Sequence, residues 1–383
     1  MKKRILPVLL ILALALTVAA CGANGGTEPP ATQPPATQPP VTPPPAGGGT
    51  IGFVTDDVDH WARDPYHIIY YNFTVTQLTA QMADAIARLG EVFNFTVEHQ
   101  TANGDADLYI TNLQTILMRE PDGLVIDVQT ELAPRVAEIL DSFGVPAVAM
   151  LNRAADADGN IIIPSVVLDQ YDVGRTQIDF LYSVYSDFWG DIDTSRIGLL
   201  SMDFSANVEI NRRSLGAEER WNQLFPGQPF FHGDTAAFGL SAEAGDQVAN
   251  SIISANPDIE YWWVVGATED ITLGATRAVE SLGLEDRVLI TSIGVAVLPR
   301  EWDAGYDGIW FAIYYVPPVT YIGTAVFGLL ALIDGRATFD TLWSEFLRPG
   351  DRAAGLLLDV GMVTRDQYHD HIRAVMNSFG LEP

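Results

Sequence analysis

The sequence predicts an α/β protein with two lobes, each a parallel β-sheet flanked by helices. Short β-branched apolar segments, polar turns and helical patterns alternate along the chain, as they do in parallel sheets covered on both faces. This rhythm starts again after Gly174. About 334 residues follow Gly49, more than one hydrophobic core normally holds. Two similar halves in succession are therefore expected.

Residues 1–20 have the order of a secretion signal. Three basic residues precede an apolar run, residues 5–20, that is shorter than the roughly 20 residues needed to span a bilayer. Small residues then precede Cys21, the single cysteine of the chain, and Gly22 follows it. This pattern resembles the bacterial lipoprotein box, and the resemblance implies cleavage before Cys21 and lipidation of its sulfur. An ordinary cleavage site that leaves a free thiol, or an uncleaved membrane anchor, is the alternative.

Residues 21–49 form the expected tether. The unit ATQPP occurs twice within residues 27–45, and VTPPP and a run of three glycines follow. This composition has no apolar face to bury and predicts an extended polyproline-type spacer with a flexible end. Acyl chains on Cys21 would hold the protein at a membrane surface without a spanning helix. The folded part is expected to start near Thr50.

Acidic residues dominate the composition. Without the three basic residues at the start, 18 arginines and no lysine stand against 49 acidic residues, a net charge of −31 (18 − 49). We therefore expect no nucleic-acid partner, and the acidic surface indicates solubility and little more. A single cysteine allows no internal disulfide, which is compatible with export.

The first half contains three strand-helix units. Residues 50–57 are the expected first strand, and residues 75–90 are the helix that follows it. The next expected elements are a strand at 94–103, a helix at 105–119, a strand at 123–127, a helix at 132–143 and a strand at 147–151.

The second half repeats the pattern. Its expected strands are residues 196–205, 229–238, 261–270 and 287–295, and its expected helices are 209–225, 244–259 and 271–283. In open α/β sheets ligands bind beyond the carboxyl ends of the strands, so two facing halves would hold a ligand between them. A later apolar run, residues 318–333, is interrupted by Gly and Thr and is too short for a membrane span, which predicts a buried helix.

Several segments, taken in their order and spacing, resemble a known family. They are IGFV (51–54), PDGLVIDVQTELAPRVAEILDSFGVPAV (121–148), VVLDQYDVG (166–174), NRRSLGAEERW (211–221), EYWWVVGATEDITLGATRAVE (260–280) and MVTRDQY (362–368). From about Thr50 to its end the chain looks like a periplasmic sugar-binding protein of the ribose, galactose and arabinose type, closest to the arabinose-binding branch. Such proteins capture the solute for a bacterial ABC importer.

The resemblance implies the type I periplasmic binding protein fold. Two Rossmann-like lobes are then joined by three crossovers, expected near residues 167–169, 315–318 and 358–361. The N-terminal lobe would comprise residues 50–167 and 317–357, and the C-terminal lobe residues 168–316 and 358–383.

The resemblance also implies ligand-binding residues on the N-terminal lobe. In the family the turn after the first strand carries polar ligands and a stacking aromatic, and here it offers Asp56, Asp57, Asp59 and Trp61. Trp61 is expected to stack on a sugar ring and Asp56 to accept a hydrogen bond from a hydroxyl. An acidic N-cap cluster beside a core tryptophan is the alternative.

Two later turns add candidates. After residues 147–151 come Asn152 and Arg153, and a one-residue ambiguity in the alignment leaves open which of them points inward. Asp169 follows at the first crossover. On the C-terminal lobe Arg213 matches the sugar-binding arginine of the family; its five donors suit vicinal hydroxyls or a carboxylate, and an ion pair on the helix surface is the alternative.

The chain departs from the family pattern at two places. Thr268, Glu269 and Asp270 stand where the family usually has an Asn-Asp pair, and Gly294, Val295 and Val297 stand where it has polar ligands. These departures predict a less polar pocket on the C-terminal lobe. Aromatic residues nearby in the chain are Phe204, Trp302, Tyr314 and Tyr315.

Other signals favour structural roles. Residues 156–160 (DADGN) lack the distal glutamate of a calcium loop and are better explained as a hairpin turn. His369 and His371 are two apart on an expected helix and should be exposed to solvent. We expect no metal, no cofactor and no catalytic residues, since the sequence has no phosphate-binding glycine loop and no recognisable triad.

The predicted function is that of a lipid-anchored, extracytoplasmic solute-binding protein, not an enzyme. Its expected ligand is a monosaccharide or related polyol, and its expected partners are an ABC permease with its ATPase and the membrane that holds the lipid anchor. A monomer is expected. A receptor that presents its ligand to a membrane signalling protein, or a surface glycan hydrolase, is the alternative.

Overall fold

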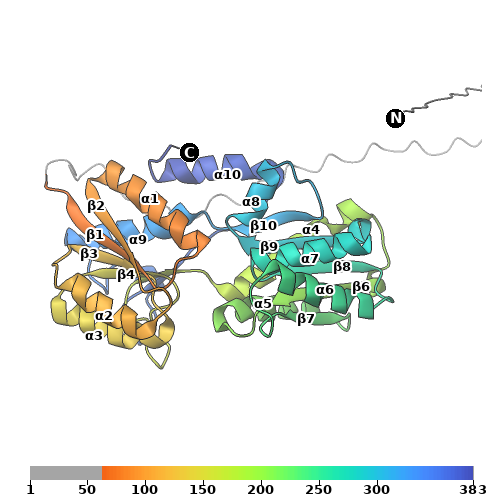
Figure 1. The fold of residues 1–383 in the computed structure, drawn as a ribbon, viewed down its shortest axis with the longest axis horizontal. Coiled ribbons are helices and arrows are strands. Elements are labelled where there is room, and N and C mark those ends of the chain that lie inside the picture. Colours follow the sequence, from red (N-terminus) through yellow and green to blue (C-terminus); the bar gives the residue numbers. More distant parts are fainter. Residues whose placement is uncertain (1–62, 383) are drawn as a thin grey trace, which may run out of the picture. The chain divides into compact units, whose positions relative to one another are not determined.

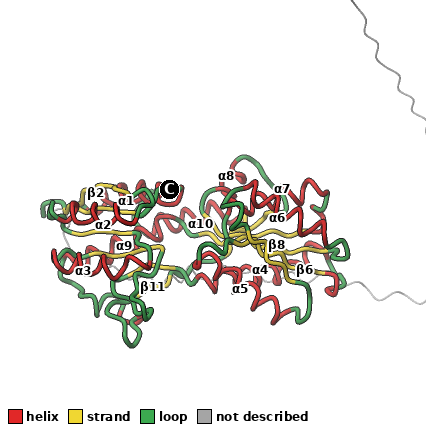
Figure 2. Tube along the Cα trace, turned by 60° about the horizontal axis from the view of Figure 1, so that its bottom comes forward, coloured by secondary structure: helices red, strands yellow, loops and turns green. Residues whose placement is uncertain are grey.

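The computed structural model describes residues 63–382, whose helices and strands form two sheets with helices on both faces (Figures 1 and 2). Both sheets are predominantly parallel, as the sequence predicts. The expected signal peptide, the lipidation site Cys21, the Pro-rich tether and the strand expected at residues 50–57 lie outside the described residues.

The first sheet has six strands in the order β2-β1-β3-β4-β5-β11, and every neighbouring pair is parallel. Its strands are β1 (Tyr66–Asn72), β2 (Phe95–Thr101), β3 (Gly123–Ile126), β4 (Ala147–Leu151), β5 (Ser165–Val167) and β11 (Gly355–Leu357). Helices α1 (Gln77–Phe93) and α9 (Pro318–Ile333) pack on one face, and α2 (Ala106–Leu117) and α3 (Ala133–Phe143) on the other. This sheet and its four helices are called the first lobe.

Strand β1 lies inside this sheet and is buried on both faces. Ile68 and Tyr70 point into the core with α1 and α9, whereas Ile69 and Tyr71 point into the core with α2 and α3; all four are fully buried. Such a strand is a continuous apolar run with no alternation. The expectation that residues 50–57 lead into the first helix was therefore wrong, because β1 leads directly into α1.

The second sheet has six strands in the order β7-β6-β8-β9-β10-β12; β12 pairs antiparallel with β10, and the other pairs are parallel. Its strands are β6 (Ile197–Asp203), β7 (Phe230–Asp234), β8 (Tyr261–Gly266), β9 (Val288–Gly294), β10 (Trp310–Tyr315) and β12 (Met362–Thr364). Helices α4 (Gln170–Trp189) and α5 (Val208–Leu224) pack on one face, and α6 (Ala242–Ala255), α7 (Glu269–Leu282) and α8 (Val297–Asp303) on the other. Together they form the second lobe.

Short 3-10 turns connect some of these elements, at Thr130–Leu132, Thr194–Arg196, Glu285–Arg287 and Ser344–Phe346.

Helices α4 and α5 meet backbone to backbone at two glycines. A Cβ on Gly174 would lie 1.8 Å from the carbonyl oxygen of Arg213, and a Cβ on Gly216 would lie 1.9 Å from the carbonyl oxygen of Tyr171. No side chain larger than hydrogen fits at either position. The contact fixes Arg213 against the first turns of α4.

The chain passes between the two sheets three times, as the fold class predicts. Residues 168–169 join β5 to α4, residues 316–317 join β10 to α9, and residues 358–361 join β11 to β12. These crossovers are linked, since Leu358 N donates to Val167 O (2.9 Å) and Tyr315 N donates to Gly361 O (3.1 Å). The crossover at 168–169 starts at the carboxyl end of β5, and the crossover at 316–317 starts at the carboxyl end of β10. The carboxyl edges of both sheets therefore lie next to the region where the crossovers connect the two lobes.

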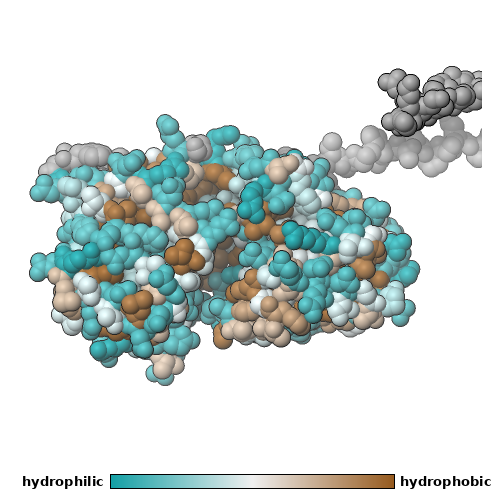
Figure 3. Space-filling view, in the orientation of Figure 1, coloured by the Kyte–Doolittle hydropathy of each residue, from teal (hydrophilic) through white to brown (hydrophobic). Residues whose placement is uncertain are grey.

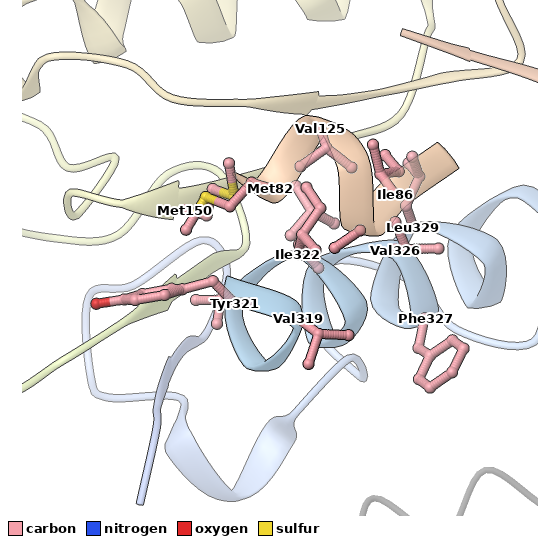
Figure 4. Close-up of a cluster of buried hydrophobic side chains, with 14 of the residues drawn as sticks. Met82, Ile86, Val125, Met150, Val319, Tyr321, Ile322, Val326, Phe327 and Leu329 are labelled. Carbon is pink, nitrogen blue, oxygen red and sulfur yellow. The ribbon is translucent and has the colours of Figure 1, made fainter. Parts of the chain in front are cut away.

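Helix α9 is the apolar run predicted to be a buried helix. Ile322, Val326 and Leu329 lie in one cluster with Met82 and Ile86 of α1 (Figure 4). Among the described helices none is long and apolar enough to cross a membrane.

The last helix, α10 (Arg365–Ser378), contacts both lobes (Figure 1). Tyr368 near its start packs in the core of the second lobe with Trp302, at 5.5 Å between ring centroids. Phe379, just past its end, packs on Phe327 of α9 (5.6 Å), and Leu381 is buried in the core of the first lobe. Of the residues expected in the C-terminal lobe, α10 and the described residues after it therefore lie against both lobes.

Two smaller expectations concern residues 156–160 and the histidines of α10. Residues 156–160 form the expected hairpin turn, with Asp156 N donating to Asn160 O (2.9 Å). The expected exposure of His371 was wrong: its ring is half-buried, 5.8 Å from that of Tyr315, and burial lowers its pKa. His369 is exposed.

On the face drawn in Figure 3, hydrophilic residues predominate and apolar residues form separate small patches. This distribution is typical of a soluble surface and marks no single large docking face in that view.

Candidate ligand-binding site

Strand β1 ends in an amide that the protein holds in one orientation. Asn72 is fully buried; its Oδ1 accepts a hydrogen bond from His99 Nε2 (2.5 Å), and its Nδ2 donates to Thr74 O. The His99 ring stacks on Tyr70 at 4.9 Å, and burial lowers its pKa. Sequence reasoning missed Asn72 because it placed the first strand elsewhere.

The turn after β1 takes the place expected for the turn that carries Asp56 and Trp61. Both of those residues precede β1 in the chain and lie outside the described residues. The turn after β1 instead presents Phe73, which is half-buried and 5.9 Å from the ring of Tyr109. An aromatic side chain is thus available at the carboxyl edge of the first sheet.

A buried carboxyl group follows β3. Asp127 is 5 % exposed, and its Oδ1 accepts a hydrogen bond from Asn152 Nδ2 (3.2 Å). Burial raises the pKa of Asp127 to about 6, although hydrogen bonds from the Phe73 backbone and from Asn152 act in the opposite direction. Asp127 is a second residue that sequence reasoning missed, although a carboxylate at the end of a fully buried strand could have indicated it.

Asn152 reaches Asp127 through a strained turn at the end of β4. Leu151 has φ of 71°, and Asn152 N donates to Met150 O two residues back (2.9 Å), which is the hydrogen bond of a γ-turn. A branched residue in the left-handed region costs energy, and such strain is concentrated at functional sites. The next residue, Arg153, is half-buried, and its guanidinium makes no hydrogen bond or ion pair within residues 63–382.

The second lobe contributes Arg213 from α5. Its Nε donates to Gln170 Oε1 (2.7 Å) and its Nη1 to Ala267 O (2.5 Å). Burial lowers its pKa to about 10, and the nearby groups of Tyr321, Glu209 and Tyr314 offset part of that effect. The alternative of a surface ion pair is wrong, since no carboxylate of the described residues lies within ion-pair distance of Arg213.

Tyr321 brings a group of the first lobe to Arg213. It is a residue of α9 and packs in the core of the first lobe, but its hydroxyl points away from that cluster (Figure 4). Arg213 therefore lies where α4, α5, α9 and the end of β8 meet.

Three of the predicted ligand-binding residues have structural contacts. Asp169 caps α4, its Oδ1 accepting from Tyr171 N (3.1 Å) and Asp172 N (3.3 Å). Glu269 accepts from the backbone N–H groups that follow β9: Oε2 from Val295 N (2.8 Å) and Ala296 N (2.9 Å), and Oε1 from Leu298 N (2.9 Å). Gly294 has no room for a side chain, because an added Cβ would lie 2.0 Å from the Glu269 carboxyl carbon.

Glu269 is buried, and its pKa is raised by burial more than the backbone hydrogen bonds lower it. Its neighbour Thr268 precedes α7 and has a buried Oγ1 with no hydrogen-bond partner among the described residues. Thr268 therefore keeps a free polar atom at the carboxyl edge of the second sheet.

Asp203, at the end of β6, is also hydrogen-bonded to groups of the protein itself. Its Oδ1 accepts from Phe204 N (2.6 Å), and Asn211, with its amide nitrogen turned toward the carboxylate, donates to Oδ2 (2.7 Å). Burial raises the pKa of Asp203. Within the described part of the chain, no group of three or more His, Cys, Asp or Glu could hold a metal ion.

Comparisons with known proteins agree with this fold. Residues 69–337 match the family described as periplasmic binding protein domain. A search of the curated proteins finds no match. Many solved structures, by contrast, are similar to this chain, and the following three are among them.

One is an ABC transporter periplasmic solute-binding protein from Actinobacillus succinogenes with bound D-allose (TM-score 0.63, 14% identity, covering 80% of this chain and 100% of that one). Another is AraP, an arabinose-binding protein from Geobacillus stearothermophilus (TM-score 0.62, 18% identity, 81% and 99%). A third is a periplasmic ribose ABC transporter protein from Conexibacter woesei (TM-score 0.60, 14% identity, 82% and 96%). At these identities the likeness shows the fold.

Proposed function

The chain belongs to the family of periplasmic binding protein domains, and we propose that it captures a small polyhydroxy solute, a monosaccharide or a close relative, and delivers it to an ABC importer. Proteins of this family bind solutes and are not enzymes, so the glycan hydrolase considered from the sequence is set aside. The family acts outside the cytoplasm.

One observation carries the proposal. Polar side chains whose orientation the protein fixes lie at the carboxyl ends of β1, β3 and β4 (Asn72, Asp127 and Asn152), and on the second lobe Arg213 of α5 is held at the end of β8. Their remaining donors and acceptors suit hydroxyl groups, because an unpaired buried polar group is costly. The solved structures of this fold with D-allose or named for arabinose binding support a sugar.

We further propose that Phe73 provides the stacking surface first assigned to Trp61. Phe73 directly follows Asn72 and is half-buried beside Tyr109, so one face of its ring is available at the carboxyl edge. Asn152, Arg153, Arg213 and Thr268 remain in the proposed contact set.

The proposal includes a lipid anchor at Cys21 and a Pro-rich tether. The order of basic, apolar and small residues before Cys21 supports the anchor, and the repeated ATQPP unit supports the tether. The anchor would keep the lobes beside the permease.

A thermal-shift screen of the full chain in detergent tests the proposal. Pentoses, hexoses, polyols and sugar acids are added at high concentration; a ligand at 100 times its Kd stabilises the native state by about 2.7 kcal/mol, which a melting curve detects easily. Asn152→Ala should abolish most of the shift, whereas Asn377→Ala, an exposed amide on α10, should leave it unchanged. If no compound of these classes raises the melting temperature, the proposed function is wrong.

A further inference from the structure

Two arginines, Arg213 and Arg153, lie at the proposed site of a chain that is rich in acidic groups. Acidic residues outnumber basic ones by 49 to 21, and nine of the 18 described arginines form an ion pair with a carboxylate, among them Arg119 with Glu98 (3.0 Å), Arg220 with Asp179 (2.6 Å) and Arg352 with Asp141 (2.6 Å). Arg213 and Arg153, at the proposed site, have no carboxylate within 4.0 Å among the described residues. The absence of an ion pair at these two arginines is therefore not due to a shortage of acidic residues in the chain.

Arg213 differs from an exposed, solvated arginine. It is half-buried, and its neighbours at hydrogen-bond distance are the neutral oxygens of Gln170 and Ala267. The phenols of Tyr321 and Tyr314 and the carboxylate of Glu209 act on it from a greater distance. A partly desolvated cation without a hydrogen-bonded counter-charge is unfavourable. Its Nη2 has no acceptor within the described residues, so this amino group of the guanidinium remains able to donate hydrogen bonds to a ligand.

Four of the acidic groups at the proposed site are already used by the protein, and Glu209, one turn before Arg213 on α5, acts on Arg213 only from beyond ion-pair distance. Asp169 caps α4, Asp203 is bonded to Phe204 N and Asn211, and Glu269 is bonded to three backbone N–H groups. Asp127 is bonded to Asn152, and its burial favours the neutral form. None of them forms an ion pair with Arg213.

From this arrangement we propose that the solute carries a carboxylate, as a sugar acid does, and that the Arg213 guanidinium binds it. The inference rests on the proposed function and names its substrate class. A planar guanidinium matches a planar carboxylate with two parallel hydrogen bonds. Arg153 adds positive charge from the first lobe.

A phosphate fits the site less well. Phosphate sites are built largely from backbone N–H groups, and the N–H groups of Val295, Ala296 and Leu298 already donate to Glu269. The overall negative charge of the chain does not oppose a carboxylate, because charges beyond about 8 Å are largely screened at physiological ionic strength.

Titration calorimetry on the full chain in detergent tests the inference with matched pairs: D-glucose against D-glucuronate and D-gluconate, and D-galactose against D-galacturonate. D-glucose 6-phosphate is the phosphate arm. At least one acid should bind roughly tenfold or more tightly than its neutral partner, and Arg213→Gln should remove that advantage by about 10- to 100-fold in Kd. Arg213→Lys, which keeps the charge but loses the fork, should retain part of it.

Arg300→Gln is the matched control, since Arg300 is exposed on α8 and the change in charge is the same. It should leave every Kd unchanged, and circular dichroism melts should show that Arg213→Gln folds. Tighter binding of the neutral sugar in every pair, tighter binding of the phosphate, or an acid advantage that persists in Arg213→Gln would overturn the inference and leave the proposed function intact. Binding of neither acids nor neutral sugars would overturn the proposed function as well.

Discussion

The buried carboxyl group of Asp127 makes the stability of the first lobe depend on pH. Its pKa is raised to about 6 from an ordinary 3.8, so the folded protein holds the proton more tightly than the unfolded chain does. The stabilising contribution is therefore complete below about pH 4 and is lost as the pH rises through 6. A shift of about two pKa units corresponds to about 3 kcal/mol in total, of which about 1 to 1.5 kcal/mol is lost between pH 5 and pH 7.5.

Asp127→Asn should remove this dependence. The amide is neutral at every pH and its oxygen can still accept from Asn152 Nδ2. We expect the free energy of unfolding of the variant, relative to that of the unmodified protein, to increase by about 1 to 1.5 kcal/mol between pH 5 and pH 7.5. Urea unfolding at both pH values, without ligand, measures this change in the free energy of unfolding. Neither pH value reaches the sequence pI of 4.3, at which the protein would be poorly soluble.

Asp258→Asn is the control, because Asp258 is exposed and the substitution should change the free energy of unfolding equally at both pH values. The reasoning fails if Asp127→Asn also shifts the two values by the same amount. It fails equally if the variant loses stability as the pH rises, since that would mean that a charged Asp127 stabilises the fold.

Three further outcomes are expected. Gly174→Ala should destabilise the second lobe by about 1 to 3 kcal/mol in urea unfolding, because its Cβ would overlap the Arg213 carbonyl, whereas Gly361→Ala, with nothing within 4 Å, should be nearly neutral; equal effects would refute the close contact. Radioactive fatty acid should label the exported protein but not Cys21→Ser, and a labelled variant would exclude lipidation at Cys21. The radius of gyration from small-angle scattering should decrease when a ligand saturates the site, as hinge closure at the crossovers requires; an unchanged value would exclude closure.

Most elements of the fold could be predicted from local pattern. The strand-helix units from β2 to β4 and from β6 to β9 lie close to their predicted positions, and α9 is the buried helix that its short, interrupted apolar run indicates. The first strand was misplaced because both 50–57 and Tyr66–Asn72 have strand composition, and local pattern does not say which enters the middle of a sheet. The pairing of β1 with β2 and β3 decides it.

The site could be predicted only in part. Asn152 follows β4, and Arg213 donates to Ala267 O beyond the end of β8, so both lie at carboxyl edges; that they bind a ligand stays a prediction. Glu269 could not be assigned its present contacts, because its partners are backbone N–H groups more than 25 residues away in the chain. Asn72 was missed because the first strand was placed elsewhere, and Asp127 was missed because its burial and its hydrogen bond to Asn152 depend on the folded arrangement.

Both ends of the described body are attached to the first lobe. At the N-terminal end Arg63 Nη1 donates to Asn94 O (3.0 Å), and Asn94 Nδ2 donates to Arg63 O (3.0 Å). At the other end Arg88 of α1 donates to Glu382 O, and Leu381 is buried in the first lobe. In mechanical terms, a pull applied between the two ends is carried within the first lobe and bypasses the crossovers. The second lobe is then loaded only through α10, whose first turn packs in its core.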